Sequence, residues 1–283
     1  MNDNTLDIRR SFFLEDIEFE KLVELQNIVY KDRGITFNKE GFKKWYIENP
    51  DGKVISFNAF HNDKMVAHYA CIPIKMNIGG RIVNGIESMA TVTHPDYRGK
   101  GLFKHLANLT YQCAKDEGYE FIIGVANANS TPGFIKYFNF TLVSQLDVKI
   151  GIGTNISQEK NKIYKRYWTQ DTINWRTNCS NNKYFLKDTS KIIGSYHKII
   201  QTFMGTFNKD TLAICNLVKH KFSFKPYLYV GLGADIKGCY FKIPKFIKRS
   251  PFNLIFMDLT DDGKLPKMTK NNVFFQLIDF DVA

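Results

Sequence analysis

The sequence predicts an α+β protein, in the wider α/β class, with a mixed, mainly antiparallel central sheet flanked by helices and a smaller mixed C-terminal domain. Segments with helical periodicity stand before and after three consecutive strand-like runs, and the connections between those runs are short enough for hairpins. The chain has 283 residues, of which 44% are hydrophobic. This length allows one large domain or two modest ones.

Two helices are expected near the N-terminus. "DIEFEKLVELQNIVYKDRG" (16–34) carries apolar residues at helical spacing, among them Leu22 and Leu25, and ends at a glycine. "NKEGFKKWYIENP" (38–50) begins with Asn38, a favourable N-cap residue, and ends at a proline.

Three strands are expected next, at 53–60, 65–78 and 86–94. The segments "HNDK" and "GGR" between them are suited to tight turns, so the three strands should pair antiparallel. An amphipathic helix follows at 102–118 and ends at Gly118.

The next elements are a buried strand, "YEFIIGVAN" (119–127), and a short helix, "STPGFIKYFNF" (130–140), with Pro132 in its first turn. The polar stretch "GIGTNISQEKNK" (151–162) predicts a linker. Strand-like runs at 212–217, 226–233, 253–259 and 272–282 then indicate a second mixed domain.

Composition limits the classes of function. The five cysteines show no C-x-x-C spacing, which favours free thiols in a reducing cytoplasm and no metal site: Cys71, Cys113, Cys179, Cys215 and Cys239. We expect a cytoplasmic protein, because no signal-like N-terminal segment and no run of about 18 apolar residues occurs.

The chain is basic, with a formal net charge of +11. Local basic density occurs at 160–167 and 242–249, but no nucleic-acid-binding signature is present. Solvated lysines are the plainer interpretation, and a site that holds several phosphates is the alternative. The sequence predicts neither nucleic-acid binding nor membrane insertion, and it leaves the oligomeric state open.

The stretch "HPDYRGKGLF" (94–103) joins a strand to the amphipathic helix through a glycine turn. Such a turn presents backbone N–H groups and the positive end of the helix dipole at one place, which suits an anionic ligand. Gly99 and Gly101 allow close approach of the ligand, while Arg98 and Lys100 add charge. The spacing fits neither a P-loop nor a dinucleotide fingerprint.

In this setting, "VTHPDYRGKGLFKHLANLTYQCAKDEGYEFIIGVANANSTPGFIKYFNF" resembles the acyl-CoA-binding core of the Gcn5-related N-acetyltransferase (GNAT) superfamily over about residues 19–145. The resemblance implies a GNAT acyl-CoA-binding domain at 1–150 and a C-terminal domain at 151–283 that completes the amine-substrate site. It also implies acyl-coenzyme A as co-substrate, with no metal. The implied coenzyme contacts are Thr91, Val92, Thr93, Arg98, Gly99, Lys100, Gly101, Leu102 and Phe103.

Two positions depart from the family's pattern. Phe103 stands where the turn usually ends in a small residue, which adds bulk beside the phosphates. Ile135 occupies the slot in which the family often keeps a tyrosine that protonates the leaving thiolate. Tyr137 lies two residues further on, about 200° around a helix, and cannot simply replace it. The source of that proton is therefore open, and water is one alternative.

Acyl transfer to an amine requires the amine to be neutral, so a general base or a desolvating pocket must remove its proton. Glu87 is the first candidate base, since the family often keeps one upstream of the pantetheine contacts; an ion-paired or solvent-facing role is its alternative. His68 is the second candidate, although a hydrogen-bonded core histidine is the plainer interpretation. Asn127 and Asn129 could each contact the pantetheine amide or cap the following helix, and capping is the plainer interpretation for Asn129.

The segments "HYACIP" and "NANSTPGFIKYFNF" also resemble the larger nucleotide-sugar N-acyltransferases of bacterial surface polysaccharide biosynthesis. This resemblance implies transfer of an acetyl or short hydroxyacyl group, such as 3-hydroxybutanoyl, to the amine of a nucleotide-linked amino sugar, for example a dTDP sugar. Trp175 and Arg176 are candidates for contacting the sugar or base. Structural packing is the alternative for Trp175, and a surface arginine is the alternative for Arg176. Another amine acceptor (peptide, polyamine or aminoglycoside) and a non-catalytic acyl-CoA-binding module remain the alternative functions.

Overall fold

The structure is a computed structural model that describes residues 6–178, 183–195, 199–213, 217–219, 225–244 and 250–280. Cys179, Cys215 and most of the basic segment 242–249 lie outside the described residues. The chain forms two compact units. The first comprises Met1–Ile74 and Asn84–Ile122, and the second comprises Lys75–Val83 and Ile123–Ala283.

The first unit begins with an edge strand that the sequence did not predict. β1 (Asp7–Ser11) pairs antiparallel with β2 (Ile55–His61). Its sequence, DIRRS, is polar because most of these side chains face solvent, so the hydrophobic alternation typical of a strand is absent.

The two predicted N-terminal helices are confirmed. α1 (Asp16–Tyr30) buries Phe19, Leu22 and Leu25 and continues into a 3-10 turn, η1 (Lys31–Arg33), which Gly34 ends in a left-handed conformation. α2 (Lys39–Tyr46) is capped by the Asn38 side chain, which accepts a hydrogen bond from the Gly41 amide at 2.8 Å.

The predicted antiparallel strands are also present. β2 pairs antiparallel with β3 (Lys64–Ile78) through a turn in which Asn62 and Asp63 both have positive φ. A second tight turn leads to β4 (Arg81–Thr93), which starts five residues earlier than expected. Within the first unit the strand order is β1-β2-β3-β4.

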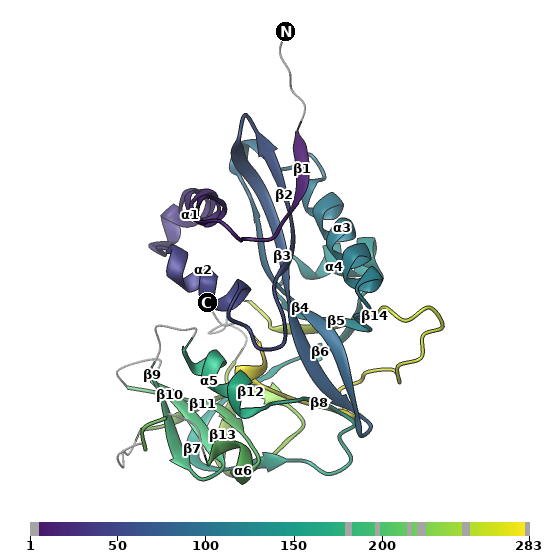
Figure 1. Cartoon of the computed structure of the whole chain (residues 1–283). Helices are drawn as coiled ribbons and strands as arrows, with labels where there is room; N and C mark the ends of the chain where they lie inside the picture. The colour runs from purple at the N-terminus through teal and green to yellow at the C-terminus, as the bar shows by residue number, and fades with distance from the viewer. Residues whose placement is uncertain are drawn as a thin grey trace. The chain divides into compact units, whose positions relative to one another are not determined.

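α3 (Leu102–Asp116) connects β4 to β5 (Phe121–Ala126), and Gly118 ends it with a positive φ, as predicted. In Figure 1, α1 and α2 lie on one face of the β1–β4 sheet and α3 lies on the other, where it packs against β2. The buried face of α3 is formed mainly by Leu102, Leu106, Ala107 and Tyr111. Helices thus cover both faces of the sheet. The packing of α3 against the sheet sets the position of its N-terminus relative to β4.

The second unit contains α4 (Thr131–Phe138), whose position and Pro132 match the prediction. β6 (Thr141–Gln145) pairs antiparallel with β14 (Asn253–Asp258). β14 in turn lies next to β5 in the strand order. A strand from near the C-terminus is therefore inserted beside strands of the first half of the chain.

The prediction of a linker at 151–162 is wrong, because most of that segment belongs to β7 (Asp147–Gln158). β7 pairs antiparallel with both β12 (Tyr227–Leu232) and β13 (Ala234–Lys242). Its glycine is required by packing: a Cβ on Gly151 would collide with the Cys239 carbonyl and the Tyr240 ring. The glycine that suggested a linker instead permits close approach of two strands.

The remaining elements of the second unit are mostly short strands. They are β8 (Tyr164–Arg166), α5 (Gln170–Asn178), β9 (Lys183–Asp188), β10 (Lys191–Ser195), β11 (Gln201–Thr206), α6 (Lys209–Leu212), β15 (Val273–Gln276) and η3 (Leu277–Asp279). β11 pairs parallel with β12, and β15 pairs parallel with β8, whereas the other strand pairings described for this unit are antiparallel. The sheet is therefore mixed and mainly antiparallel, as predicted.

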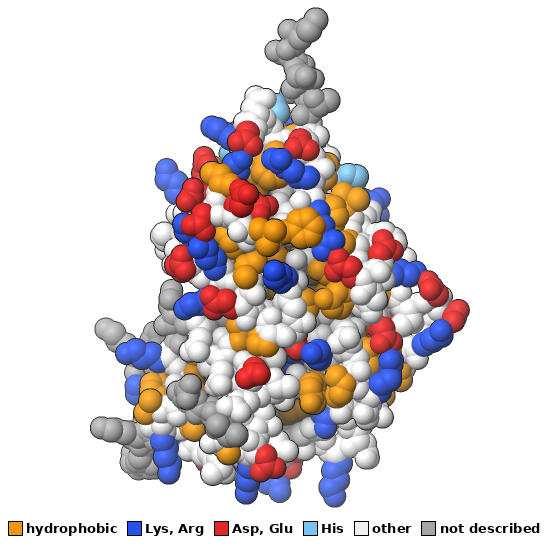
Figure 2. Space-filling view, viewed as in Figure 1, with side chains coloured by type: hydrophobic (Ala, Val, Ile, Leu, Met, Phe, Trp, Pro, Cys, Tyr) orange, Lys and Arg blue, Asp and Glu red, His pale blue; other side chains and the backbone are white. Residues whose placement is uncertain are grey.

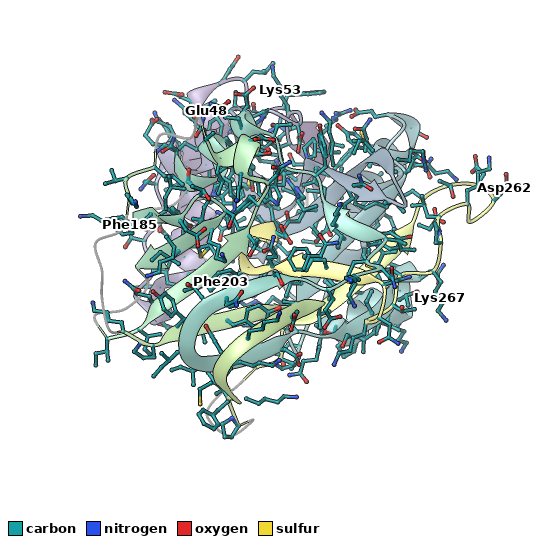
Figure 3. All side chains as sticks on the ribbon, turned by 90° about the horizontal axis from the view of Figure 1, so that it is seen from below. Glu48, Lys53, Phe185, Phe203, Asp262 and Lys267 are labelled. Atoms are coloured by element: carbon teal, nitrogen blue, oxygen red, sulfur yellow. The ribbon has the colours of Figure 1, made fainter. Side chains whose placement is uncertain are left out.

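The predicted strands at 226–233 and 253–259 are confirmed by β12 and β14. Within the expected strand at 272–282, β15 is followed by η3, and residues 281–282 lie outside the described part of the chain. The strand expected at 212–217 is wrong at its start, where Leu212 ends α6; residues 214–216 lie outside the described part of the chain. A buried cluster of Ile156, Ile193, Phe203, Tyr227 and Tyr229 forms a core of this unit. Figure 3 labels Phe203 in this cluster and Phe185, which packs against it.

The two compact units do not coincide with the expected division into 1–150 and 151–283, since residue 150 lies within β7. The separate functional roles assigned to those two segments stay predictions. None of the helices within the described ranges is both long and apolar enough to cross a lipid bilayer. On the face shown in Figure 2, Lys and Arg side chains are interspersed with Asp and Glu and do not gather into one stripe.

Candidate active site

The glycine turn between β4 and α3 has the conformation that the sequence predicted. A 3-10 turn, η2 (Pro95–Tyr97), follows β4 and leads into Arg98, which is extended. Gly99 and Gly101 then adopt φ values of +76° and +74°, in the left-handed region that favours glycine. Both glycines are exposed. The turn therefore depends on glycine for its backbone conformation.

Neighbouring side chains hold this turn in place. The His94 amide donates to the Val66 carbonyl at 2.9 Å, which ties the start of the turn to β3. The Tyr97 hydroxyl lies 2.6 Å from His61 Nδ1 at the end of β2. The Lys100 ammonium lies 4.6 Å from the centre of the Tyr97 ring, and Arg98 Nε donates to the Thr93 carbonyl at 3.4 Å. Neither His61 nor Tyr97 was singled out from the sequence, because no local motif marks this contact.

The N-terminus of α3 is suited to an anion. Its N-cap residue is Gly101, and no side chain caps it; the first hydrogen bond within the helix runs from the His105 amide to the Gly101 carbonyl at 3.0 Å. The amides of a helix's first turn lack acceptors within the helix, and the helix dipole places positive charge there. A Cβ built on Gly99 or Gly101 would meet no other protein atom within 4 Å. The space above the turn is open, so the residues present fit a diphosphate such as that of coenzyme A.

The first two helical residues have different environments. Leu102 is buried in the face of α3 that covers the sheet. The half-buried Phe103 packs its ring against Tyr69 of β3, with 5.8 Å between ring centres. Tyr69 also bonds the Tyr111 hydroxyl of α3 at 2.5 Å and the Ser88 hydroxyl of β4 at 2.7 Å. The sequence suggested that the Phe103 side chain would crowd the phosphates. Its ring instead packs in part against Tyr69 of β3.

β4 is less buried over its C-terminal half than over residues 85–87, which are buried. Ser88, Met89, Ala90 and Thr93 are half-buried, Thr91 is exposed and Val92 is buried. The partial exposure of this stretch would let an extended amide-containing ligand approach the strand. This geometry is compatible with the predicted pantetheine contacts at Thr91, Val92 and Thr93, which stay a prediction.

Glu87 precedes this partly exposed stretch on the same strand. Its residue is only 5% exposed, so the solvent-facing alternative raised from the sequence does not describe it. Cys71 of β3 is close enough for the Glu87 charge to contribute, together with burial, to raising the pKa of the Cys71 thiol. A carboxylate held away from bulk water is a stronger proton acceptor than one in water. The role of Glu87 as a base stays a prediction.

His68 lies in the core of the first unit, 1% exposed, with both ring nitrogens in hydrogen bonds. Nε2 lies 2.8 Å from the Tyr46 hydroxyl and Nδ1 lies 2.6 Å from Asn58 Oδ1. Desolvation by burial lowers the pKa of His68 from 6.5 to about 3. These contacts are those of a hydrogen-bonded core histidine, and its catalytic role stays a prediction.

At the end of β5, the Asn127 side chain holds the turn before α4, and the N-cap residue of α4 is Ser130, which has no side-chain cap hydrogen bond. The Asn127 Oδ1 atom accepts from the amides of Asn129 and Ser130 at 2.9 and 3.0 Å. The suggestion that Asn129 caps the helix is therefore wrong, because the turn begins two residues earlier in an Asx-type conformation. The Asn129 residue is exposed. Its coenzyme contact stays a prediction.

The two α4 residues discussed for thiolate protonation are both at the surface. Ile135 is 41% exposed and Tyr137 is 48% exposed. The Lys136 ammonium lies 5.5 Å from the centre of the Tyr137 ring. The structure thus supplies no tyrosine in the slot that Ile135 occupies, and the source of the proton stays open.

Trp175 and Arg176 are buried in the second unit on α5. Arg176 is 5% exposed, and its guanidinium donates to the Ile278 carbonyl at 3.2 Å and the Phe280 carbonyl at 2.8 Å. These bonds hold the C-terminal segment. The alternative of a surface arginine is wrong for Arg176, whereas the burial of Trp175 agrees with its packing alternative. Contact of either residue with an acceptor substrate stays a prediction.

The fold and the turn together resemble those of acyl-CoA-dependent acyltransferases. Residues 13–143, a little under half of the chain, match the family profile described as "Acetyltransferase (GNAT) domain". A comparison with curated proteins returned no match.

Solved structures share the fold over most of the chain. One is a conserved protein of unknown function, a probable N-acyltransferase, from Enterococcus faecalis V583: it is 7% identical, with a TM-score of 0.61 over 90% of this chain and 73% of that chain. Two GCN5-related N-acetyltransferases are each 11% identical with a TM-score of 0.55. That from Kribbella flavida covers 89% of this chain and 72% of its own, and that from Anabaena variabilis ATCC 29413 covers 90% and 73%. At these identities the likeness concerns the fold alone.

Proposed function

We propose that this N-acyltransferase moves an acetyl or short hydroxyacyl group from coenzyme A to the amine of a nucleotide-linked amino sugar. The use of coenzyme A is supported by one observation. The open turn at Gly99 and Gly101 leads directly into the N-terminus of α3, which no side chain caps. Acyl-coenzyme A supplies an activated thioester. The turn would hold its diphosphate, and the partly exposed stretch of β4 would hold its pantetheine arm.

The acceptor class is supported by charge. The chain has an excess of 11 positive charges, and its basic residues are spread over both halves of the sequence. A nucleotide-linked sugar carries its own diphosphate, so coenzyme and acceptor would both bring negative charge to the protein. A polycationic acceptor, such as a polyamine, would favour an acidic surface instead. We further propose that residues 151–283 supply the acceptor specificity.

In this proposal Glu87 accepts the proton that the attacking amine loses. It lies on β4 directly before the partly exposed residues 88–91. The coenzyme turn acts by position, because fixed amides cost no reorganisation when they bind the diphosphate. His68 is the alternative base, and both of its ring nitrogens are already held in hydrogen bonds by Tyr46 and Asn58.

The test is an acyl-transfer assay with purified protein. Acetyl-CoA and 3-hydroxybutanoyl-CoA are each combined with dTDP-linked amino sugars, a polyamine, an aminoglycoside and a peptide amine, and release of free thiol is followed. We expect release that depends on both the acyl-CoA and the amino-sugar nucleotide, and a product whose mass rises by the acyl group. Turnover only with another amine would reassign the acceptor, and coenzyme binding without turnover on any amine would indicate a non-catalytic module.

A further inference from the structure

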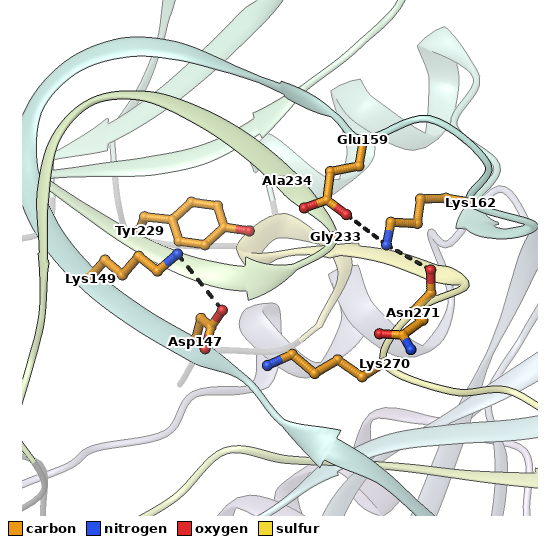
Figure 4. A pocket seen from close by; sticks show the side chains of 9 residues that line it. All are labelled: Asp147, Lys149, Glu159, Lys162, Tyr229, Gly233, Ala234, Lys270 and Asn271. Atoms are coloured by element: carbon orange, nitrogen blue, oxygen red, sulfur yellow. Dashed lines mark hydrogen bonds and ion pairs between the residues drawn. The ribbon is translucent and has the colours of Figure 1, made fainter.

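The second unit contains a polar pocket that none of the predicted site residues line. It has a volume of about 170 Å³. Its lining comes from five separate segments: Asp147, Lys149, Glu159, Lys162, Tyr229, Gly233, Ala234, Lys270 and Asn271. Figure 4 shows the side chains of Lys149, Lys270 and Tyr229 pointing toward the same space. The volume is several times that of one water molecule, about 30 Å³, but less than the roughly 300 Å³ of a small-molecule site, so it suits one chemical group of a ligand.

Lys162 is built into the pocket and is not a surface lysine. Its side chain is only 6% exposed, and its ammonium lies 2.8 Å from Glu159 Oε2 and 2.7 Å from the Asn271 carbonyl. Gly233 makes room for it, because a Cβ at that residue would collide with the Val273 carbonyl and lie 2.9 Å from Lys162 Cε. A buried ammonium needs such partners to offset its desolvation. The geometry around Lys162 is therefore fixed.

The pocket carries a surplus of positive charge. It has three lysines and two carboxylates, and the two carboxylates pair with two of the lysines: Glu159 with Lys162, and Asp147 with Lys149 at 3.8 Å. Lys270 is the third lysine, and it makes no ion pair with an acidic residue of the described ranges at 4.0 Å or less. The Asp147–Lys149 pair is long and partly exposed, which leaves Lys149 able to turn toward an anion.

Tyr229 adds a neutral donor from the floor of the pocket. Its ring is buried with Ile156 and Phe203, and its pKa is raised by desolvation, so the phenol keeps its proton. Tyr229 is the cross-strand partner of Lys149 in the β7–β12 pairing, which places both on one patch of sheet.

We propose that this pocket binds a phosphoryl group of a small molecule. Ammonium groups that approach from several directions, with a phenol hydroxyl, match a tetrahedral anion with several oxygens. A planar carboxylate is more often recognised by the two-pronged arginine, and no arginine lines this pocket. The glycine turn of the first unit contributes no residue to the lining of this pocket, and the inference does not depend on which amine the enzyme acylates.

The probe is inorganic phosphate, titrated at constant ionic strength with sodium chloride and followed by ³¹P line broadening. We expect saturable binding that Lys270→Gln weakens on the order of fivefold or more, because the unpaired positive charge is lost. Lys264→Gln is the matched control. Lys264 lies on the same connection between β14 and β15, and its ammonium pairs outside the pocket with Asp262 at 3.1 Å. Its replacement by glutamine removes the same charge as Lys270→Gln does. Figure 3 labels Asp262 and Lys267 on this connection.

A second variant, Tyr229→Phe, keeps the buried ring and removes only the phenol donor; it should also weaken phosphate binding. Equal effects of Lys270→Gln and Lys264→Gln, or no saturable binding beyond that seen with chloride, would overturn the proposal. Any phosphate that binds at the glycine turn contributes equally in these variants, so this result is independent of the coenzyme site. Turnover assays then identify the source of the group: a raised KM for the acceptor alone assigns it to the acceptor, and unchanged KM values assign it to a separate ligand.

Discussion

The Tyr46 hydroxyl lies 2.8 Å from His68 Nε2 inside the core of the first unit. On the other side of the ring, Asn58 uses its Nδ2 group to donate to Ser11 Oγ, so its Oδ1 atom faces His68 Nδ1. Nδ1 must then carry a proton. In the neutral imidazole Nε2 accepts from the Tyr46 hydroxyl, so the neutral ring satisfies both partners. Burial disfavours the charged form, and the network links β1, β2, β3 and α2.

This arrangement predicts a stability that falls in mild acid. The folded-state pKa of His68 is about 3, below the ordinary 6.5, so between these values the unfolded chain binds a proton that the folded chain does not. The contribution of His68 to stability is thus complete above pH 6.5 and is lost as the pH falls toward 3, by up to about 1.4 kcal/mol per pH unit. Urea unfolding at several pH values measures this slope. His68→Gln should flatten it, whereas His105→Gln, at an exposed position on α3, should leave it unchanged.

Gly101→Ala should weaken binding of coenzyme A strongly. Alanine at φ +74° is strained by about 1–2 kcal/mol, and its Cβ would project into the open space above the turn, where the diphosphate is expected. Gly79→Ala is a matched control, since Gly79 also has a positive φ, +60°, with no atom near its Cβ. Both variants should lose similar stability, and only Gly101→Ala should lose affinity in calorimetry. Equal affinities in the two variants would remove the turn from the coenzyme site.

Glu87→Gln tests the proposed base. The amide has nearly the same shape and cannot accept the proton, so kcat should fall by about 10²–10⁴-fold and the acidic limb of the pH profile should disappear. Affinity for acyl-CoA should be retained, which separates loss of chemistry from loss of binding. A decrease of only a few-fold would leave Glu87 as a buried structural residue and return attention to an amine that loses its proton without a protein base.

Arg176→Ala should destabilise the protein, because the carbonyls of Ile278 and Phe280 would lose their buried donor. We expect a loss of about 2–4 kcal/mol in the free energy of unfolding, measured by urea titration. The acceptor KM, measured at a temperature at which the variant is folded, addresses the binding role expected from the sequence. A raised acceptor KM with unchanged stability would assign Arg176 to the substrate and contradict the structural role.

The sequence determined those features that depend on neighbours along the chain. Helical periodicity located α1 and α3, Asn38 marked the start of α2, and the pattern around Gly99 and Gly101 located the coenzyme turn, because periodicity, capping and positive φ are local properties. Where the signal was weak, the prediction failed. The polar sequence of β1 lacks the hydrophobic alternation of a strand. The glycines of β7 suggested a linker, and the reason for Gly151 becomes visible only in the packing of β7 against β13.

The tertiary structure decided which polar residues are buried and which distant ones meet. Nothing in the sequence near His68 indicates that Tyr46 and Asn58 bond its ring. The sequence suggested Arg176 as a ligand-binding residue, and only the tertiary structure shows that its guanidinium bonds the C-terminal segment. Lys149, Lys162 and Lys270 come from three segments up to about 120 residues apart and converge only because β7, β12 and the turn before β15 pack together. Burial and convergence depend on long-range packing, and one-dimensional spacing carries no measure of either.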